Sequence, residues 1–162
     1  EFVFSFRAKI ADEPKQKTAE VKIEHYNFAG RRVLVAEDNL LNREIAHNIL
    51  ENAGFAVEEA VNGREAVAKV SAAEPYYYDL VLMDIQMPVM DGYEAARTVR
   101  ALSDPGRGDI PIVAMTANAF EEDRQRALKA GMNDHIAKPV DIQQMMNVLE
   151  KVLRSDKDKK TN

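Results

Sequence analysis

The chain has 162 residues, of which 46% are hydrophobic and 30% are charged, and it contains no cysteine. This length suits one domain with tails, and no apolar run approaches the roughly 20 residues that a membrane-spanning helix needs. The net charge is −5, and its acid excess lies in the middle of the chain because neither end is acidic overall. We therefore expect a cytoplasmic domain with no nucleic-acid partner and no direct membrane contact, and leave open a membrane-anchored parent protein.

The two ends of the chain differ from its middle. In residues 1–10, Phe2, Phe4 and Phe6 fall on one side of an extended chain, which predicts a strand with no neighbour of its own. Residues 11–30 are polar and predict a linker, and residues 155–162 are charged and predict a solvated, disordered tail. Residues 31–154 remain as the predicted folded domain.

Within that domain, short apolar runs alternate five times with amphipathic stretches. This alternation predicts an α/β fold, in which helices cover both faces of a parallel sheet. Several of the runs are apolar without a break, as strands buried on both faces are. The predicted strands are RVLVAED, FAVEEAV, YDLVLMD, IPIVAMT and HIAKP, at residues 32–38, 55–61, 78–84, 110–116 and 135–139.

Helices are predicted between these strands. The first places Leu41, Ile45, Ile49 and Ala53 at helical spacing and should end at Gly54. The remaining four should begin near Asn62, Asp91, Ala119 and Asp141, and Asn62, Asp91 and Asp141 are suited to cap them.

Polar residues follow four of the predicted strands at their carboxyl ends, where open parallel sheets bind ligands. They are Glu37, Asp38, Asp84, Thr116 and Lys138. If the strand order is 2-1-3-4-5, the first and third strands are neighbours, and Glu37, Asp38 and Asp84 share one pocket.

Three carboxylates in one pocket repel one another unless a cation joins them. Oxygen ligands without cysteine or clustered histidine favour Mg²⁺ over zinc, with Mn²⁺ as an alternative ion. The hydroxyl of Thr116 and the ammonium of Lys138 are suited to bind phosphoryl oxygens. Asp84, central in the sheet, is the carboxylate best placed to act as a nucleophile and form an acyl phosphate.

Four motifs in this order resemble the receiver domains of two-component signalling, over roughly residues 31–154. They are VLVAEDNLLN, DLVLMDIQMPVMDG, IPIVAMTANAF and AGMNDHIAKPVD. The resemblance implies the flavodoxin-like doubly wound sheet, of order 2-1-3-4-5 with five helices. It also implies that Asp84 accepts a phosphoryl group from a partner's phosphohistidine.

The resemblance further implies the ligands of the site. Glu37, Asp38, Asp84 and the backbone carbonyl of Gln86 would hold Mg²⁺. Thr116 and the backbone N–H of Ala117 would bind the phosphoryl group, Lys138 would pair with it, and the Lys138–Pro139 peptide bond would be cis. The family's conformational switch couples Thr116 to an aromatic side chain, and His135 occupies that position in this chain.

The wording of the motifs is most similar to the C-terminal receivers of hybrid sensor histidine kinases. FVFSFRAKI is similar to the closing strand of a kinase ATP-binding domain, which places the receiver after the catalytic module of a phosphorelay. The partners would then be a kinase domain carrying phosphohistidine and a histidine phosphotransfer domain, and the receiver would phosphorylate and dephosphorylate itself.

Other functions remain open at this point. A stand-alone response regulator would share the same motifs. An aspartate-nucleophile phosphohydrolase commonly has a second acid two residues after the nucleophile, where this chain has Gln86. A docking domain independent of phosphorylation would be expected to lack Asp84, Thr116 or Lys138, and all three are present. A dinucleotide-binding fold lacks its glycine motif here.

Overall fold

The sheet explains where the polar residues gather. The computed structural model describes residues 26–118 and 120–161. Five parallel strands form one sheet in the order β2-β1-β3-β4-β5, which confirms the predicted topology. The strands are β1 (Arg32–Ala36), β2 (Ala56–Ala60), β3 (Leu80–Asp84), β4 (Ile112–Thr116) and β5 (Asp134–Ala137).

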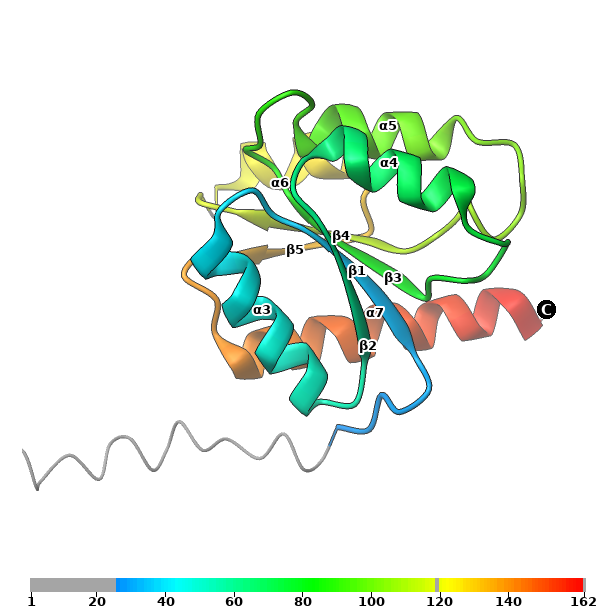
Figure 1. Ribbon diagram of the computed structural model, residues 1–162, viewed down its shortest axis with the longest axis horizontal. Helices are drawn as coiled ribbons and strands as arrows, with labels where there is room; N and C mark the ends of the chain where they lie inside the picture. Colours follow the sequence, from blue (N-terminus) through cyan, green and yellow to red (C-terminus); the bar gives the residue numbers. More distant parts are fainter. Residues whose placement is uncertain (1–25, 119, 162) are drawn as a thin grey trace, which may run out of the picture.

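Five helices in the described residues cover the sheet in two layers (Figure 1). On one face lie α3 (Leu40–Asn52) and α7 (Ile142–Thr161), and on the other lie α4 (Gly63–Ala72), α5 (Gly92–Arg100) and α6 (Glu121–Lys129). This is the doubly wound arrangement, in which the strand order reverses between β1 and β3, and the helices that follow these two neighbouring strands, α3 and α5, lie on opposite faces of the sheet.

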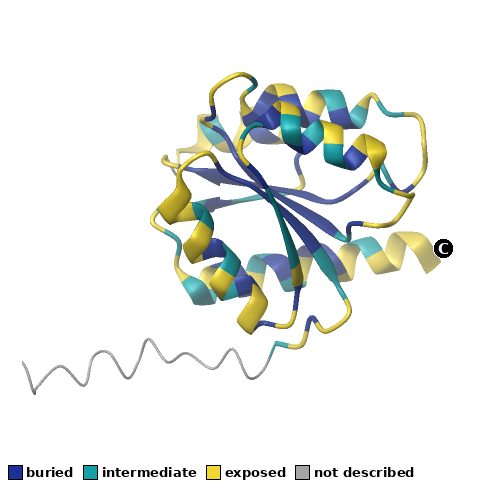
Figure 2. Ribbon diagram, viewed as in Figure 1, coloured by how far each residue is buried: buried dark blue, intermediate teal, exposed yellow. Residues whose placement is uncertain are grey.

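Strand side chains alternate between two hydrophobic cores. In β3, Val81 and Met83 face the core under α4, α5 and α6, whereas Leu80 and Leu82 face the core under α3 and α7. Every residue of β3 and β4 is buried, as the unbroken apolar runs predict. Figure 2 shows the centre of the sheet as buried, whereas the edge strand β2 is mostly of intermediate burial.

The buried face of α3 includes only part of the apolar row at helical spacing, because Ala53 is buried and Ile49 packs against the core while the two earlier members are exposed. Leu41 is 65% exposed and Ile45 is 45% exposed, while Ala46 and Leu50 are buried against the sheet with Ala53. The small side chains of Ala46 and Ala53 allow α3 to approach the sheet closely, so a narrow stripe completes the core. The start of α3 is therefore exposed (Figure 2), and Leu40, Leu41 and Ile45 are its exposed apolar residues.

The helix ends follow the local signals in the sequence. The side-chain oxygens of Asn62, Asp91 and Asp141 each accept a backbone N–H bond of 2.8 Å from three residues further on. Gly54 follows the end of α3 with φ of +106°, a conformation that suits glycine. The helix predicted near Ala119 begins at Glu121, and Ala119 itself lies outside the described residues.

The predicted disordered tail is wrong for residues 155–161, because α7 continues to Thr161. Lys160 binds Asp156 one turn earlier at 2.6 Å, and its ammonium lies 5.1 Å from the centre of the Tyr76 ring. Basic side chains in the last turn also favour the helix dipole. The strand predicted in residues 1–10 falls outside the described residues. Among the helices described, none has the length and apolarity to cross a membrane.

Candidate functional site

Buried polar side chains mark one end of the sheet. In the described part of the chain, the buried non-aromatic polar side chains are Glu37, Asp84 and Thr116, exposed by 1%, 4% and 8%. They lie at the carboxyl ends of β1, β3 and β4. Burying a polar group is costly unless it has a partner. Three buried polar side chains at neighbouring strand ends therefore indicate a functional site.

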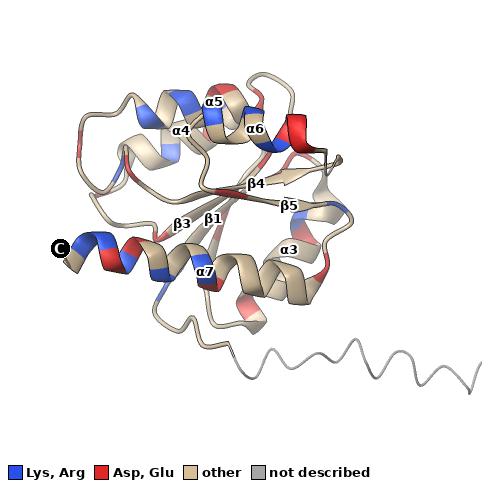
Figure 3. Cartoon of the chain, turned by 180° about the vertical axis from the view of Figure 1, so that it is seen from behind, with Lys and Arg blue, Asp and Glu red and all other residues tan. Residues whose placement is uncertain are grey.

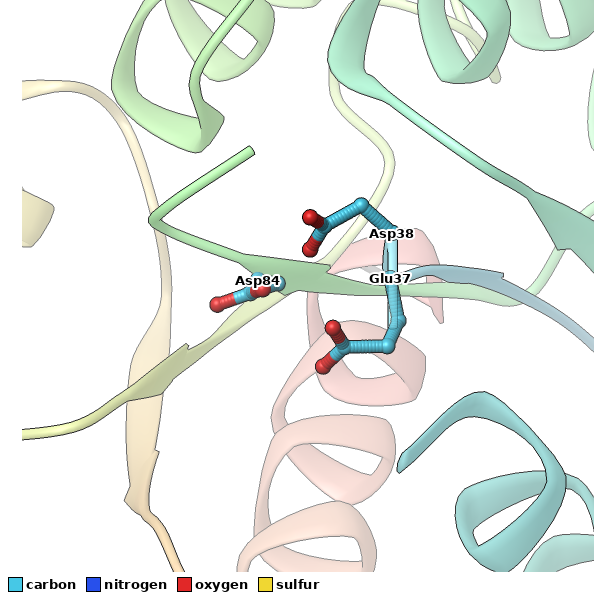
Figure 4. Close-up of side chains that lie close together, drawn as sticks. All are labelled: Glu37, Asp38 and Asp84. Atoms are coloured by element: carbon cyan, nitrogen blue, oxygen red, sulfur yellow. The ribbon is translucent and has the colours of Figure 1, made fainter. Parts of the chain in front are cut away.

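Three carboxylates converge at this end of the sheet. One oxygen each from Glu37, Asp38 and Asp84 lies within 4.8 Å of the others (Figure 4). Glu37 and Asp84 are buried, whereas Asp38 is exposed, so the cluster opens toward solvent. An all-oxygen donor set that is open on one side fits Mg²⁺, which binds through one or two carboxylates and keeps several waters.

Lys138 brings a cation to the same cluster. Its ammonium lies 2.8 Å from Oε2 of Glu37 and 3.1 Å from Oδ1 of Asp84. It directly follows β5, where its backbone N–H donates to the Thr116 carbonyl at 2.7 Å, and the Lys138–Pro139 bond is cis as predicted. The backbone pairing of β4 with this segment therefore positions the side chain.

The charges shift one another's protonation. Burial raises the pKa of the Glu37 carboxyl, with the Asp84 charge acting in the same direction and the Lys138 hydrogen bond acting against both. Burial alone would lower the pKa of the Lys138 ammonium, but its hydrogen bonds to Glu37 and Asp84 outweigh this effect and raise it. Lys138 thus remains a full cation between the two carboxylates.

Thr116 lies beside the cluster at the end of β4. Its hydroxyl donates to the carbonyl of Asn118 at 2.9 Å and accepts that residue's N–H at 3.2 Å. Thr116 and Ala117 line a hollow that also contains Gln86 and Tyr93. Because the hydroxyl is satisfied locally, binding a phosphoryl group would require it to exchange the bond to the Asn118 carbonyl.

Gln86 and His135 have different places in the structure. The backbone N–H of Gln86 donates to Oδ1 of Asp84 at 3.3 Å, and the Gln86 side chain is exposed. His135 lies on β5 opposite Ala114 of β4, and its side chain is 24% exposed. Its Nδ1 is 3.6 Å from Oδ1 of Asp134. The position on β5 beside β4 is compatible with the predicted coupling to Thr116, which remains a prediction.

Gly92 is a supporting residue that sequence reasoning missed. A Cβ at this position would lie 2.3 Å from the carbonyl oxygen of Asp84 and 2.9 Å from Cα of Ile85. The Gly92 N–H donates to the Ile85 carbonyl at 2.9 Å. The start of α5 is therefore pressed against the end of β3, and the Asp-Gly pair at the helix start was the available signal.

Arg43 is a second residue that sequence reasoning missed. Its Nη1 donates to the Glu37 carbonyl at 2.9 Å and its Nε donates to Glu59 at 3.1 Å. The signal available in the sequence was an arginine in the first turn of a helix that begins shortly after Glu37 and Asp38. A basic residue is unfavourable at that end of a helix.

Charge is interspersed over the helices next to the site. Acidic residues occupy the first turn of α6, and basic residues follow in its last turn (Figure 3). This order matches the helix dipole. The acids Glu121, Glu122 and Asp123 therefore stabilise the helix that begins beside the Thr116 hollow.

Comparison with known proteins agrees with this geometry. The family model described as the response regulator receiver domain matches residues 33–150. Among curated proteins, hybrid signal transduction histidine kinase I of Dictyostelium discoideum is 34% identical over 131 residues, or 80% of this chain and 8% of its own length. The peroxide stress-activated histidine kinase mak1 of Schizosaccharomyces pombe is 33% identical over 85% of this chain and 9% of its own length. The chain thus spans only a small part of these relatives.

Solved structures show the same fold. The receiver domain of sensor histidine kinase PA1611 from Pseudomonas aeruginosa PAO1, crystallised with a magnesium ion in its active-site cleft, is 38% identical. Its TM-score is 0.69, with 77% of this chain and 98% of that one covered. The Saccharomyces cerevisiae Ssk1 receiver, solved with the phosphotransfer protein Ypd1, is 31% identical with a TM-score of 0.65, covering 77% and 88%. This chain belongs to the response regulator receiver domain family.

Proposed function

We propose that this chain is the phosphoacceptor receiver of a hybrid sensor histidine kinase, and that Asp84 takes a phosphoryl group from phosphohistidine. The carrying observation is the ammonium of Lys138 within 3.1 Å of Asp84, beside the cluster of three carboxylates. A carboxylate nucleophile surrounded by other negative charges needs cations nearby to accept a phosphoryl group. The Lys138 ammonium is one such cation, and a metal ion bound by the three carboxylates would be the other.

In the proposed transfer, a carboxylate oxygen of Asp84 attacks phosphorus as the bond to the donor's imidazole nitrogen breaks. The electron pair of that bond returns to the imidazole. Lys138 pairs with one phosphoryl oxygen and compensates its charge, while the Thr116 hydroxyl and the Ala117 N–H bind the other phosphoryl oxygens. The carboxylate of Asp84 keeps its orientation because the Asp84 backbone is part of β3 and its Oδ1 accepts the Gln86 N–H.

We assign the cation site to Glu37, Asp38, Asp84 and the backbone carbonyl of Gln86. The spacing and oxygen chemistry of the three carboxylates fit Mg²⁺, with Mn²⁺ as an alternative ion. When bound, the cation supplies charge neutralisation at the phosphoryl oxygens. The magnesium in the PA1611 receiver supports this assignment.

The surface around the site suits a helical partner. Leu40, Leu41 and Ile45 on α3 are 60%, 65% and 45% exposed, and Ile45 lines an apolar hollow with Pro139 and Val140. Lys138 lines the same hollow, so a partner seated there reaches the phosphorylation site. Exposed apolar side chains around a hollow favour an amphipathic helix. We propose a histidine phosphotransfer domain as this partner, and the complex of Ypd1 with the Ssk1 receiver supports the proposal.

The parent protein is proposed from the relatives, several of which are hybrid histidine kinases. The upstream kinase domain would be the phosphohistidine donor, and residues 1–10 would close its ATP-binding domain. We retain His135 as the proposed partner of Thr116 in a conformational switch. A histidine there can turn inward as an aromatic ring does.

The test is phosphorylation by acetyl phosphate with Mg²⁺, followed by intact mass. We expect the wild type to gain one phosphoryl group and Asp84→Asn to gain none. Asp91→Asn is the matched control, because asparagine preserves the helix cap at that position and the same change of charge is made seven residues away. Equal labelling of the wild type and Asp84→Asn would remove Asp84 from its proposed role.

A further inference from the structure

We propose that Arg43 is a positioning residue, which holds the turn between β1 and α3 so that Glu37 and Asp38 face Asp84 for cation binding. This inference rests on the proposed function, because it concerns the cation site of the same phosphoacceptor. It adds a residue that does not touch the cation and acts through the backbone of two proposed ligands.

The guanidinium of Arg43 reaches back from α3 to the turn before it. Its Nη1 donates to the carbonyl of Glu37 at 2.9 Å, with a longer contact of 3.4 Å to the carbonyl of Asp38. The Arg43 side chain is only 12% exposed. A single group therefore fixes the main chain of both residues whose carboxylates flank Asp84.

A second contact fixes the guanidinium itself. Nε of Arg43 donates to Oε2 of Glu59 on β2 at 3.1 Å, and the other oxygen of Glu59 lies 2.7 Å from Nδ1 of His47. A carboxylate can only accept, so the His47 ring donates to it. Glu59 is thereby held on both oxygens, and Arg43 joins β2, α3 and the acidic turn.

The location of Arg43 goes against helix electrostatics. It lies in the first turn of α3, where the helix dipole favours acids, and this turn contains none. An ion pair with Glu59 alone could be made from many surface positions. The hydrogen bonds to the carbonyls of Glu37 and Asp38 need a donor at this position, and a local rule broken beside a site indicates a role in that site.

Other groups hold the same turn at different points. The Glu37 N–H donates to the Ala60 carbonyl at 3.0 Å, and the Asn39 N–H donates to Oε1 of Glu37 at 3.1 Å. These bonds fix the start of the turn and one carboxylate, but neither binds the carbonyl of Glu37. Loss of Arg43 would release that carbonyl and allow the two acids to separate.

The measurement is Mg²⁺ affinity by isothermal titration calorimetry, on the whole chain. Removing groups that orient metal ligands typically weakens affinity by about 10- to 100-fold, and we expect Arg43→Met to fall in this range. Arg43→Lys keeps a cationic donor for one carbonyl but cannot bind Glu59 at the same time, so we expect an intermediate affinity. Arg97→Met, an exposed arginine of α5, is the matched control and should bind as the wild type does.

A second readout separates positioning from chemistry. If Arg43 acts only through the turn, saturating Mg²⁺ should restore the acetyl phosphate reaction of Arg43→Met. A reaction that stays slow at saturating Mg²⁺ would contradict this role. Melting temperatures without Mg²⁺ show whether a variant is poorly folded. If Arg43→Met is, the Mg²⁺ affinity of Arg43→Lys tests the inference instead, because lysine keeps the aliphatic stem and the helix propensity.

Asp38→Asn distinguishes failure of this inference from failure of the proposed site. If Asp38→Asn loses Mg²⁺ binding and Arg43→Met binds as the wild type does, the proposed site stands and the role of Arg43 is wrong. If Asp38→Asn also binds normally, the cation is held elsewhere and the proposed site is wrong. Weak binding by Arg43→Met with partial recovery in Arg43→Lys supports the inference.

Discussion

Lys138 places its ammonium between two carboxylates that are almost fully buried, those of Glu37 and Asp84. Buried charges are stable only when they are paired, and removing one partner leaves the others uncompensated. Lys138 therefore stabilises the fold when no metal ion is bound, and it compensates phosphoryl charge in the proposed reaction. Its contact with two carboxylates also explains why a single substitution here would change both properties.

Tyr78 provides a pH-dependent test of the fold at the residue scale. Burial raises the pKa of its hydroxyl well above the ordinary value, and the neighbouring Glu58, which accepts its hydrogen bond at 3.1 Å, acts in the same direction. The unfolded chain releases this proton near pH 10, whereas the folded protein retains it, so the stabilisation is lost as pH rises above that point.

We expect Tyr78→Phe to lose less stability than the wild type between about pH 9 and pH 11. At neutral pH the variant should be less stable by about 1 kcal/mol, because it lacks the hydrogen bond to Glu58. Urea unfolding across this pH range measures both effects. Parallel loss of stability in the two proteins would show that Tyr78 does not titrate differently in the folded state.

At the scale of elements, the site depends on how closely helix starts approach strand ends. The first residue of α5 packs on the last residue of β3, and a Cβ on Gly92 would overlap the Asp84 carbonyl. The Asp91 side chain caps α5 at this same point. The absence of one side chain thus lets the helix begin directly against the strand that ends in Asp84.

Gly92→Ala should therefore disturb both stability and the proposed chemistry. We expect a loss of about 1–3 kcal/mol or more from the forced backbone shift, together with slower phosphorylation of Asp84. Gly30→Ala is the control, because a Cβ there meets nothing within 4 Å and the cost comes only from φ of +82°. Urea unfolding and the acetyl phosphate reaction give the two readouts. A Gly92→Ala protein that reacts as fast as the wild type would contradict the coupling.

At the scale of the whole molecule, the two halves of α7 contribute unequally to the core. Leu149 and Leu153 are buried in the core that α3 and α7 cover, but the buried residues of α7 end at Leu153. Beyond that residue the helix is held by surface contacts such as the ion pair of Lys160 with Asp156. The last two turns therefore add length to α7 and little to the core.

Truncation after Arg154 should cost less than about 1 kcal/mol, because ion pairs at the protein surface contribute little. Leu149→Ala, which removes a fully buried side chain from the same helix, should cost about 2–5 kcal/mol. Urea unfolding of both variants provides the comparison. A truncation as costly as Leu149→Ala would mean that the last turns of α7 belong to the cooperative core.

The sequence alone was sufficient for the parallel sheet and for the polar residues at its rim. Unbroken apolar runs in β3 and β4 are typical of strands buried on both faces, and the carboxyl ends of parallel strands share an edge, so Glu37, Asp84 and Thr116 were expected at one rim. The strand order that makes them neighbours came from the resemblance to receiver domains, and the structure confirms it. The caps at Asn62, Asp91 and Asp141 are local signals of the same kind, because they depend on residues three positions apart.

Tertiary structure decided what local patterns leave open. The apolar stripe of α3 is wide enough for two rotations, and packing against the sheet buried Ala46 and Leu50 while leaving Leu41 and Ile45 exposed. The bonds of Arg43 to Glu37 and to Glu59 join residues from separate elements, whose approach no spacing in the sequence fixes. Local propensity sets where elements begin, but the face that a helix buries and the partners of a long side chain depend on where the elements finally pack.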